Sequence, residues 1–137
     1  MSEGITGRAS PIMSIDDPHI RAAVEAAFDA YELAVTTNDV ETLDALFWND
    51  PRTLRYGATE NLKGYEAIHA FRVARPGRGL QRTILDRSIT TFGDEFAVAN
   101  ITFRRDGETR IGRQSQSWVC VDGQWRIVAA HVSWMDM

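Results

Sequence analysis

The sequence predicts an α+β fold in which N-terminal helices pack on one face of a curved, mainly antiparallel β-sheet. Apolar residues recur at helical spacing in the first half of the chain, and segments rich in β-branched and aromatic residues follow from residue 82 onward. Asp106–Gly107 and Asp122–Gly123 separate these later segments, and Asp-Gly is a strong hairpin signal because both turn positions favour positive φ. Helices that precede a run of hairpins are typical of a layered α+β architecture.

Three helices are expected. The first covers about residues 18–35, because Asp17 can cap its N-terminus and Pro18 suits its first position. Its apolar stripe comprises Ile20, Val24, Ala27, Phe28, Tyr31, Ala34 and Val35. A short second helix is expected over residues 40–47 after the capping sequence NDVE, and a third over residues 63–75, where PGRG ends it.

The remaining elements are expected to be strands. A short strand, TLRYG at residues 53–57, lies between the second and third helices. Four longer strands then form an antiparallel meander over residues 82–92, 95–105, 109–121 and 124–135.

Length and composition predict a cytoplasmic single domain over residues 16–137, preceded by a flexible tail over residues 1–15. No apolar run approaches the roughly 20 residues of a membrane span, and the N-terminus lacks the apolar core of a signal peptide. Cys120 is a single cysteine, so no internal disulfide is possible. The net charge of -4 argues against a nucleic-acid partner. The three histidines lack metal-ligand spacing, and we expect no metal and no organic cofactor.

Positive charge is concentrated in one stretch of this acidic chain, residues 49–79. Its basic residues are Arg52, Arg55, Lys63, Arg72, Arg75 and Arg78. In TLRYG, strand alternation places Arg55 on the face opposite Leu54 and Tyr56. If that face lines a pocket, Arg55 needs an anion, because an unpaired buried charge is costly. An ion pair with Glu60 or with an acid of the first helix is an equally good interpretation.

Arg72 and Arg75 are three residues apart, so they share a face near the end of the third helix. They either complement the C-terminal end of the helix dipole or form a two-arginine clamp for a carboxylate. Tyr31 lies on the apolar stripe of the first helix, where it is either a core residue or a hydroxyl donor to a ligand.

Polar residues occupy both faces of the strand at residues 109–121. Gln116 shares one face with Gln114, Trp118 and Cys120, a pattern that fits a wet cavity, an exposed face or a dimer interface. On the last strand, alternation places His131 on the same face as Ile127, so we expect His131 to point inward, either as a hydrogen-bonded core residue or as part of the pocket lining.

Three segments resemble the AtzH-like and HpxZ-like proteins, a subgroup of the SnoaL-like branch of the nuclear-transport-factor-2-like superfamily. They are FWNDPRTLRYGATENLKGYEAIHAFRVAR, GRQSQSWV and WRIVAAHVSWM, and the resemblance covers about residues 18–136. It implies a cone-shaped fold with a pocket between helices and sheet, which Tyr31 and Arg55 face. It also favours the clamp interpretation, at least for Arg72.

The resemblance further implies a decarboxylating amidohydrolase that acts on carboxylated ureas, such as 1,3-dicarboxyurea, in cyanuric-acid catabolism. Tyr31 and Arg55 would be catalytic, while Arg72, Arg75, Gln116 and His131 would bind the substrate. The alternative is a non-catalytic ligand-binding or accessory protein of oxalurate catabolism that partners an amidase. Isomerisation or cyclisation fits less well, because those reactions need an inward carboxylate.

Self-association is also expected, as a homodimer or a higher oligomer. Sheets of such folds often pack back to back, and Trp118 or Trp134 could form the interface if they point outward.

Overall fold

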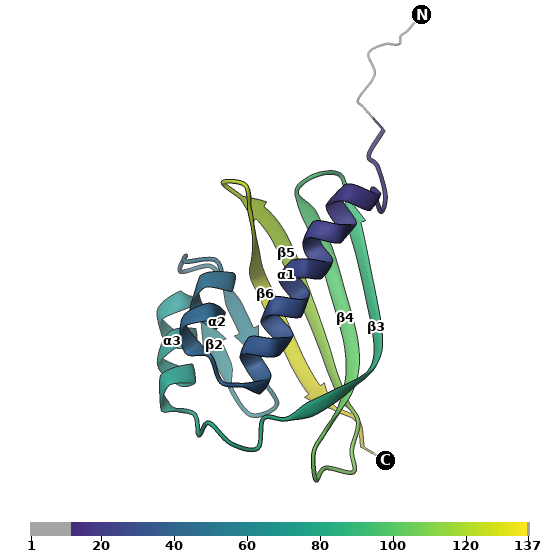
Figure 1. Cartoon of the computed structure of the whole chain (residues 1–137). Coiled ribbons are helices and arrows are strands. Elements are labelled where there is room, and N and C mark those ends of the chain that lie inside the picture. The colour runs from purple at the N-terminus through teal and green to yellow at the C-terminus, as the bar shows by residue number, and fades with distance from the viewer. Residues whose placement is uncertain (1–11, 137) are drawn as a thin grey trace, which may run out of the picture.

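The computed structural model describes residues 12–136 and contains three helices on one side of a single six-stranded sheet (Figure 1). The helices are α1 (Pro18–Thr36), α2 (Val40–Leu46) and α3 (Tyr65–Ala74). The strands are β1 (Leu54–Tyr56), β2 (Asn61–Lys63), β3 (Arg82–Phe92), β4 (Phe96–Arg105), β5 (Gly112–Val121) and β6 (Gln124–Trp134). The expected α+β fold class is confirmed. No helix in the described range is long and apolar enough to cross a membrane.

The strand order is β2-β1-β6-β5-β4-β3, and every pairing is antiparallel except that of β1 with β6. The parallel pairing places Arg55 of β1 beside Ala130 of β6, so the short strand between the helices joins the C-terminal meander. The sequence predicted this meander and β1 but not β2, which is only three residues long. β1 and β2 thereby bring the segment that carries α3 to one edge of the sheet (Figure 1).

The helix caps form as the sequence predicts. The Asp17 carboxylate accepts hydrogen bonds from the backbone N–H groups of His19 and Ile20, at 2.9 and 3.4 Å. Asp39 accepts one from Thr42 at 3.1 Å and so caps α2. The apolar stripe of α1 faces the sheet, and its fully or nearly buried members are Val24, Phe28, Tyr31 and Ala34.

Most of the expected tail at residues 1–15 lies outside the described residues. Ser14 and Ile15 belong to the expected tail but are among the described residues, and they contact the turn between β3 and β4. Gly93 donates its N–H to the Ser14 carbonyl at 2.8 Å, and Ile15 forms an antiparallel bridge with Phe92. The contacts of the domain therefore begin before residue 16.

A β-bulge changes which residues of β6 face the helices. Ser117 pairs with Ala129, but the next residue of β5, Trp118, pairs with Ile127, so Val128 is the extra residue. Ile127 and Ala130, three apart, are both buried. The alternation is thus reversed beyond the bulge, and His131 lies exposed on the opposite face, 5.8 Å from the Tyr56 ring. The expectation that His131 points inward is wrong for this reason.

Trp118 and Trp134 lie on the inner face of the sheet. Trp118 is completely buried under α1, and Trp134 lies beyond the bulge against the Phe103 ring, at 5.6 Å between centroids. The expectation of an outward tryptophan at a subunit interface is therefore wrong for both residues. Self-association stays a prediction without this support.

Gly112 allows the close packing of β5 against Phe103. A Cβ atom at this position would lie only 2.3 Å from the Phe103 ring. The ring cannot move away easily, because it is completely buried and the Arg82 guanidinium lies 4.4 Å from its centre.

We expect Gly112→Ala to lower the free energy of unfolding by about 2 kcal/mol, as is usual for overpacking in a core. Urea denaturation measures this value. Gly77→Ala is the matched control, because its new Cβ would meet only the flexible side chain of Asn38, at 3.2 Å. Equal effects of the two substitutions would contradict the proposed packing constraint.

Candidate anion-binding site

A pocket of about 360 Å³ lies between the end of α3, the β1–β2 turn and the ends of β4 and β6. This volume suits a small organic molecule, since typical sites measure roughly 300–1,000 Å³. Its wall combines charged side chains with apolar ones, among them Phe71, Leu80, Val132 and Trp134. We call it the arginine pocket, because its charged residues are Arg55, Glu60, Arg75, Arg78 and Arg105.

The arginine pocket has an excess of positive charge. Arg55 donates to the Glu60 carboxylate at 2.8 Å, and this is the one ion pair between charged residues of its wall. Within residues 12–136, Arg75 and Arg105 form no ion pair with an acidic side chain. The Nε and Nη2 atoms of Arg75 and the Nε atom of Arg105 are buried without an acceptor. Buried donors of this kind are costly, and oxygen atoms of an anion would satisfy them.

Crowding of like charges acts on the same two guanidinium groups. Burial lowers the pKa of Arg75, and the neighbouring Arg55 cation lowers it further. Burial also lowers the pKa of Arg105, and Arg82 adds to the effect. Both groups remain cations at neutral pH, because the ordinary pKa of arginine is so high. An anion bound between them would relieve the repulsion.

Local structure explains how these arginines reach one place. Alternation on β1 turns Arg55 toward the pocket while Leu54 and Tyr56 face the other side, as the sequence predicted. Arg75 follows the last residue of α3 and is extended, which its neighbour Pro76 favours. The Phe71 ring lies 5.3 Å from the Arg55 guanidinium and 5.9 Å from that of Arg75, so it supports both cations.

Arg72 is not part of the pocket wall, so it does not form a clamp with Arg75 there. It is 3% exposed, and its guanidinium carbon lies 4.2 Å from the Phe47 ring centre. Burial lowers the pKa of Arg72 to about 10, which leaves it charged at neutral pH. Its ion-pair partner is Asp44 at 3.3 Å, whose other carboxylate oxygen lies 2.6 Å from His69 Nδ1. Arg72 is thus paired within the fold, unlike Arg75.

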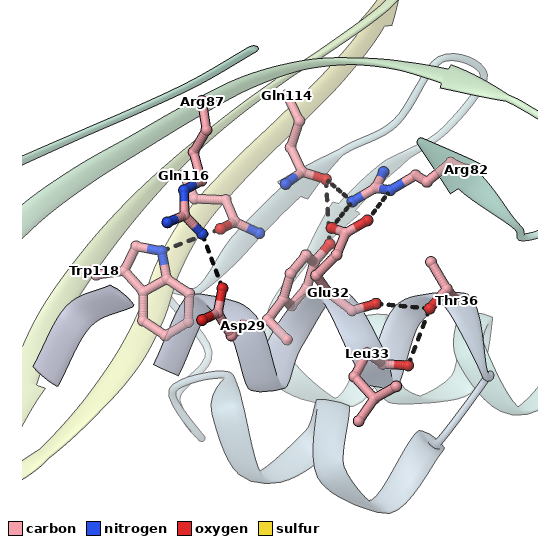
Figure 2. Close-up of polar contacts among 10 residues, drawn as sticks. Asp29, Glu32, Leu33, Thr36, Arg82, Arg87, Gln114, Gln116 and Trp118 are labelled. Carbon is pink, nitrogen blue, oxygen red and sulfur yellow. Dashed lines mark hydrogen bonds and ion pairs between the residues drawn. The ribbon is translucent and has the colours of Figure 1, made fainter. Parts of the chain in front are cut away.

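Tyr31 belongs to a buried polar network under α1. Its hydroxyl donates to Gln114 Oε1 at 3.3 Å, and Arg82 Nη2 donates to the same oxygen at 3.2 Å. Arg82 in turn makes two hydrogen bonds with the Glu32 carboxylate, at 2.9 and 2.7 Å (Figure 2). Tyr31 is 5% exposed and is not part of the pocket wall. Of the two roles considered from the sequence, this burial fits the core residue.

Gln116 also lies outside the arginine pocket. It is 2% exposed, and its Oε1 accepts a hydrogen bond from the Trp118 indole at 3.1 Å (Figure 2). The Nε2 atoms of Gln114 and Gln116 are buried without acceptors. Buried donors without acceptors therefore also occur under α1, but Gln114 and Gln116 are not among the residues that line the arginine pocket.

Of the six residues expected at the site, the pocket wall includes Arg55 and Arg75. Sequence reasoning missed Arg105. A usable signal was present, because Ile101, Phe103 and Arg105 alternate on β4 and the first two are buried. Extending that inward face by one more residue would have placed Arg105 at the pocket.

The fold is that of the nuclear-transport-factor-2-like superfamily. A protein of this type from Pseudomonas putida KT2440 superimposes with a TM-score of 0.72 over 85% of this chain and 87% of its own, at 18% identity. At this identity the likeness shows the fold alone.

The chain belongs to the AtzH-like family, whose model matches residues 13–137. A Pectobacterium atrosepticum protein of unknown function from the DUF3225 family is 54% identical, with a TM-score of 0.87 over 89% of this chain and 95% of its own. A cystatin-like fold protein from Burkholderia xenovorans LB400 is 42% identical, with a TM-score of 0.87 over 91% of this chain and 98% of its own. No curated protein sequence matches the chain.

The pairing of Arg72 with Asp44 gives a stability prediction. Asp44→Ala leaves the buried Arg72 cation without its acid, so we expect the free energy of unfolding to fall by about 3 kcal/mol. Arg72→Met removes the charge and retains packing on Phe47, so its effect should be below about 1 kcal/mol. Urea denaturation of both variants tests this. A greater loss in Arg72→Met than in Asp44→Ala would show that the unpaired cation is not the main cost.

Proposed function

We propose that the chain binds a small dicarboxylate in the arginine pocket and hydrolyses carboxylated ureas, such as 1,3-dicarboxyurea, without a cofactor. The observation that carries the proposal is the presence of buried Arg75 and Arg105 N–H groups that lack acceptors, in a wall with four arginines and one carboxylate. Membership of the AtzH-like family supports it. The place of action would be the cytoplasm, in nitrogen catabolism.

Binding would use the planar fork of arginine, which matches the two oxygens of a carboxylate. Arg75 and Arg105 would hold one carboxylate, and Arg55 would contact the scissile end of the substrate. An isomerase or cyclase would need an inward carboxylate base in an apolar pocket. The cationic wall of the arginine pocket argues against those reactions.

The proposed reaction breaks the bond between a urea nitrogen and a carboxylate carbon. The electron pair of this bond goes to the nitrogen, which takes a proton from the Tyr31 hydroxyl, and the carboxylate leaves as CO₂. Water then returns the proton to Tyr31, and the hydroxide that remains combines with CO₂ as bicarbonate. Arginine N–H groups would stabilise the charge that develops in this step. The Tyr31 hydroxyl would have to turn from Gln114 toward the substrate.

One observation favours the second candidate function, a non-catalytic ligand-binding or accessory protein of oxalurate catabolism that partners an amidase. The Tyr31 hydroxyl donates a hydrogen bond to Gln114, and Tyr31 is not part of the pocket wall. A protein that only binds a carboxylate would need the arginines but no proton donor.

Carboxylate binding is tested by calorimetric titration with malonate. We expect Arg75→Ala and Arg105→Ala each to weaken binding about 10- to 100-fold, because each removes charge-assisted hydrogen bonds. Arg113→Ala is the matched control, since Arg113 is exposed on the outer face of β5. An absence of malonate binding by the wild type would contradict the proposed anion site.

Turnover is tested by bicarbonate release from 1,3-dicarboxyurea prepared in situ. We expect Tyr31→Phe to lower kcat by about 10²- to 10⁴-fold with little change in malonate affinity, the range for loss of an acid–base group. Arg55→Ala should lower both kcat and affinity. Unchanged turnover in Tyr31→Phe would contradict its role as acid, and malonate binding without turnover by the wild type would favour the accessory function.

A further inference from the structure

Glu60 is the one carboxylate in the wall of the arginine pocket. Its Oε2 accepts from Arg55 Nη1 and its Oε1 from the Thr59 hydroxyl, both at 2.8 Å. Partial burial raises the pKa of the Glu60 carboxyl, but the hydrogen bonds from Thr59 and Arg55 outweigh this and lower the pKa overall. Glu60 is therefore ionised at neutral pH.

Backbone geometry fixes where this carboxylate lies. Gly57 and Glu60 begin and end the turn between β1 and β2, and the Gly57 N–H donates to the Glu60 carbonyl at 2.9 Å. A Cβ atom at position 57 would lie 1.7 Å from Glu60 Oε2. The missing side chain of Gly57 thus provides the space in which the carboxylate rests against the backbone, and both residues line the pocket.

An ionised carboxylate can only accept hydrogen bonds, and it has about four lone-pair sites. Thr59 and Arg55 use two of them. The remaining lone pairs of Glu60 attract N–H groups and repel any carboxylate placed beside them. Arg75 and Arg105 instead attract carboxylates and repel N–H groups. The arginine pocket therefore has two kinds of recognition element, several cationic donors and one anionic acceptor.

We propose that Glu60 is a specificity-determining residue that accepts a hydrogen bond from an N–H group of the bound molecule. The pocket would select a carboxylate that carries a urea or amide N–H, and reject a molecule of the same shape with C–H there. A site built to bind an N–H discriminates in this way, because its polar group is left unpaired by the analogue. This proposal rests on the proposed function, since Arg75 and Arg105 must hold the carboxylate.

Two probes with the same connectivity of heavy atoms test the proposal by calorimetric titration at neutral pH. Hydantoate, H₂N–CO–NH–CH₂–COO⁻, and levulinate, CH₃–CO–CH₂–CH₂–COO⁻, differ only in that N–H groups replace C–H groups. Malonate, which has no N–H, serves as the reference for carboxylate binding. We expect the wild type to bind hydantoate at least 10-fold more tightly than levulinate.

Two variants change Glu60 in different ways. Glu60→Gln keeps an oxygen for Arg55 but replaces the other oxygen by an NH₂ group, and Gly57→Ala keeps the charge but displaces the carboxylate. Both should reduce the hydantoate preference to within about twofold without weakening malonate binding. Glu25→Gln is the matched control, because Glu25 pairs with Arg21 at 3.1 Å on α1, outside the pocket wall.

The outcomes separate the two proposals. If malonate binds in an Arg75-dependent manner but the wild type binds hydantoate and levulinate equally, the role of Glu60 is wrong and the anion site stands. A preference that persists in both Glu60→Gln and Gly57→Ala also overturns the role of Glu60. If none of the three probes binds to the wild type, both proposals fail.

Discussion

Burial of arginine is the constraint on which much of this structure depends. A guanidinium group removed from water needs an acid, an aromatic ring or both. Glu32, Asp44 and Glu60 supply the acids for Arg82, Arg72 and Arg55. The same three arginines also lie over the rings of Phe103, Phe47 and Phe71. Helices and strands distant in sequence are thereby tied together around one side of the sheet.

The candidate functional site contains the arginines that this pairing leaves without an acid. Arg75 and Arg105 also lie against aromatic rings, of Phe71 and Trp134, but no acid pairs with them in the described chain. Removing two charges from water without such a partner reduces stability. An anion that completes their hydrogen bonds would recover that cost on binding, so the proposed affinity for a carboxylate would offset a local instability of the fold.

Small irregularities decide which side chains reach the pocket. The bulge at Val128 reverses the alternation of β6, which turns Trp134 inward and His131 outward. Just after β1, the strand that pairs with β6, Gly57 leaves space for the Glu60 carboxylate. Each effect depends on a single residue, so the composition of the site is more sensitive to local backbone detail than the fold is.

The sequence by itself determined the helices, the meander and the placement of Arg55 on the face opposite Leu54 and Tyr56, because periodicity and capping act over a few neighbouring residues. For Arg75 it left two roles open, at the end of the helix dipole or in a clamp at the pocket, and the family resemblance implied substrate binding. Tertiary structure decided the rest. Whether Arg72 and Arg75 act together depends on Asp44, which lies 28 residues before Arg72 and pairs with only one of the two. Arg105 lies near Arg75 only because the ends of β4 and α3 line the same pocket, and His131 points outward because of a bulge whose register requires the partner strand. Contacts between distant segments set these features, although alternation on β4 does indicate the inward direction of Arg105.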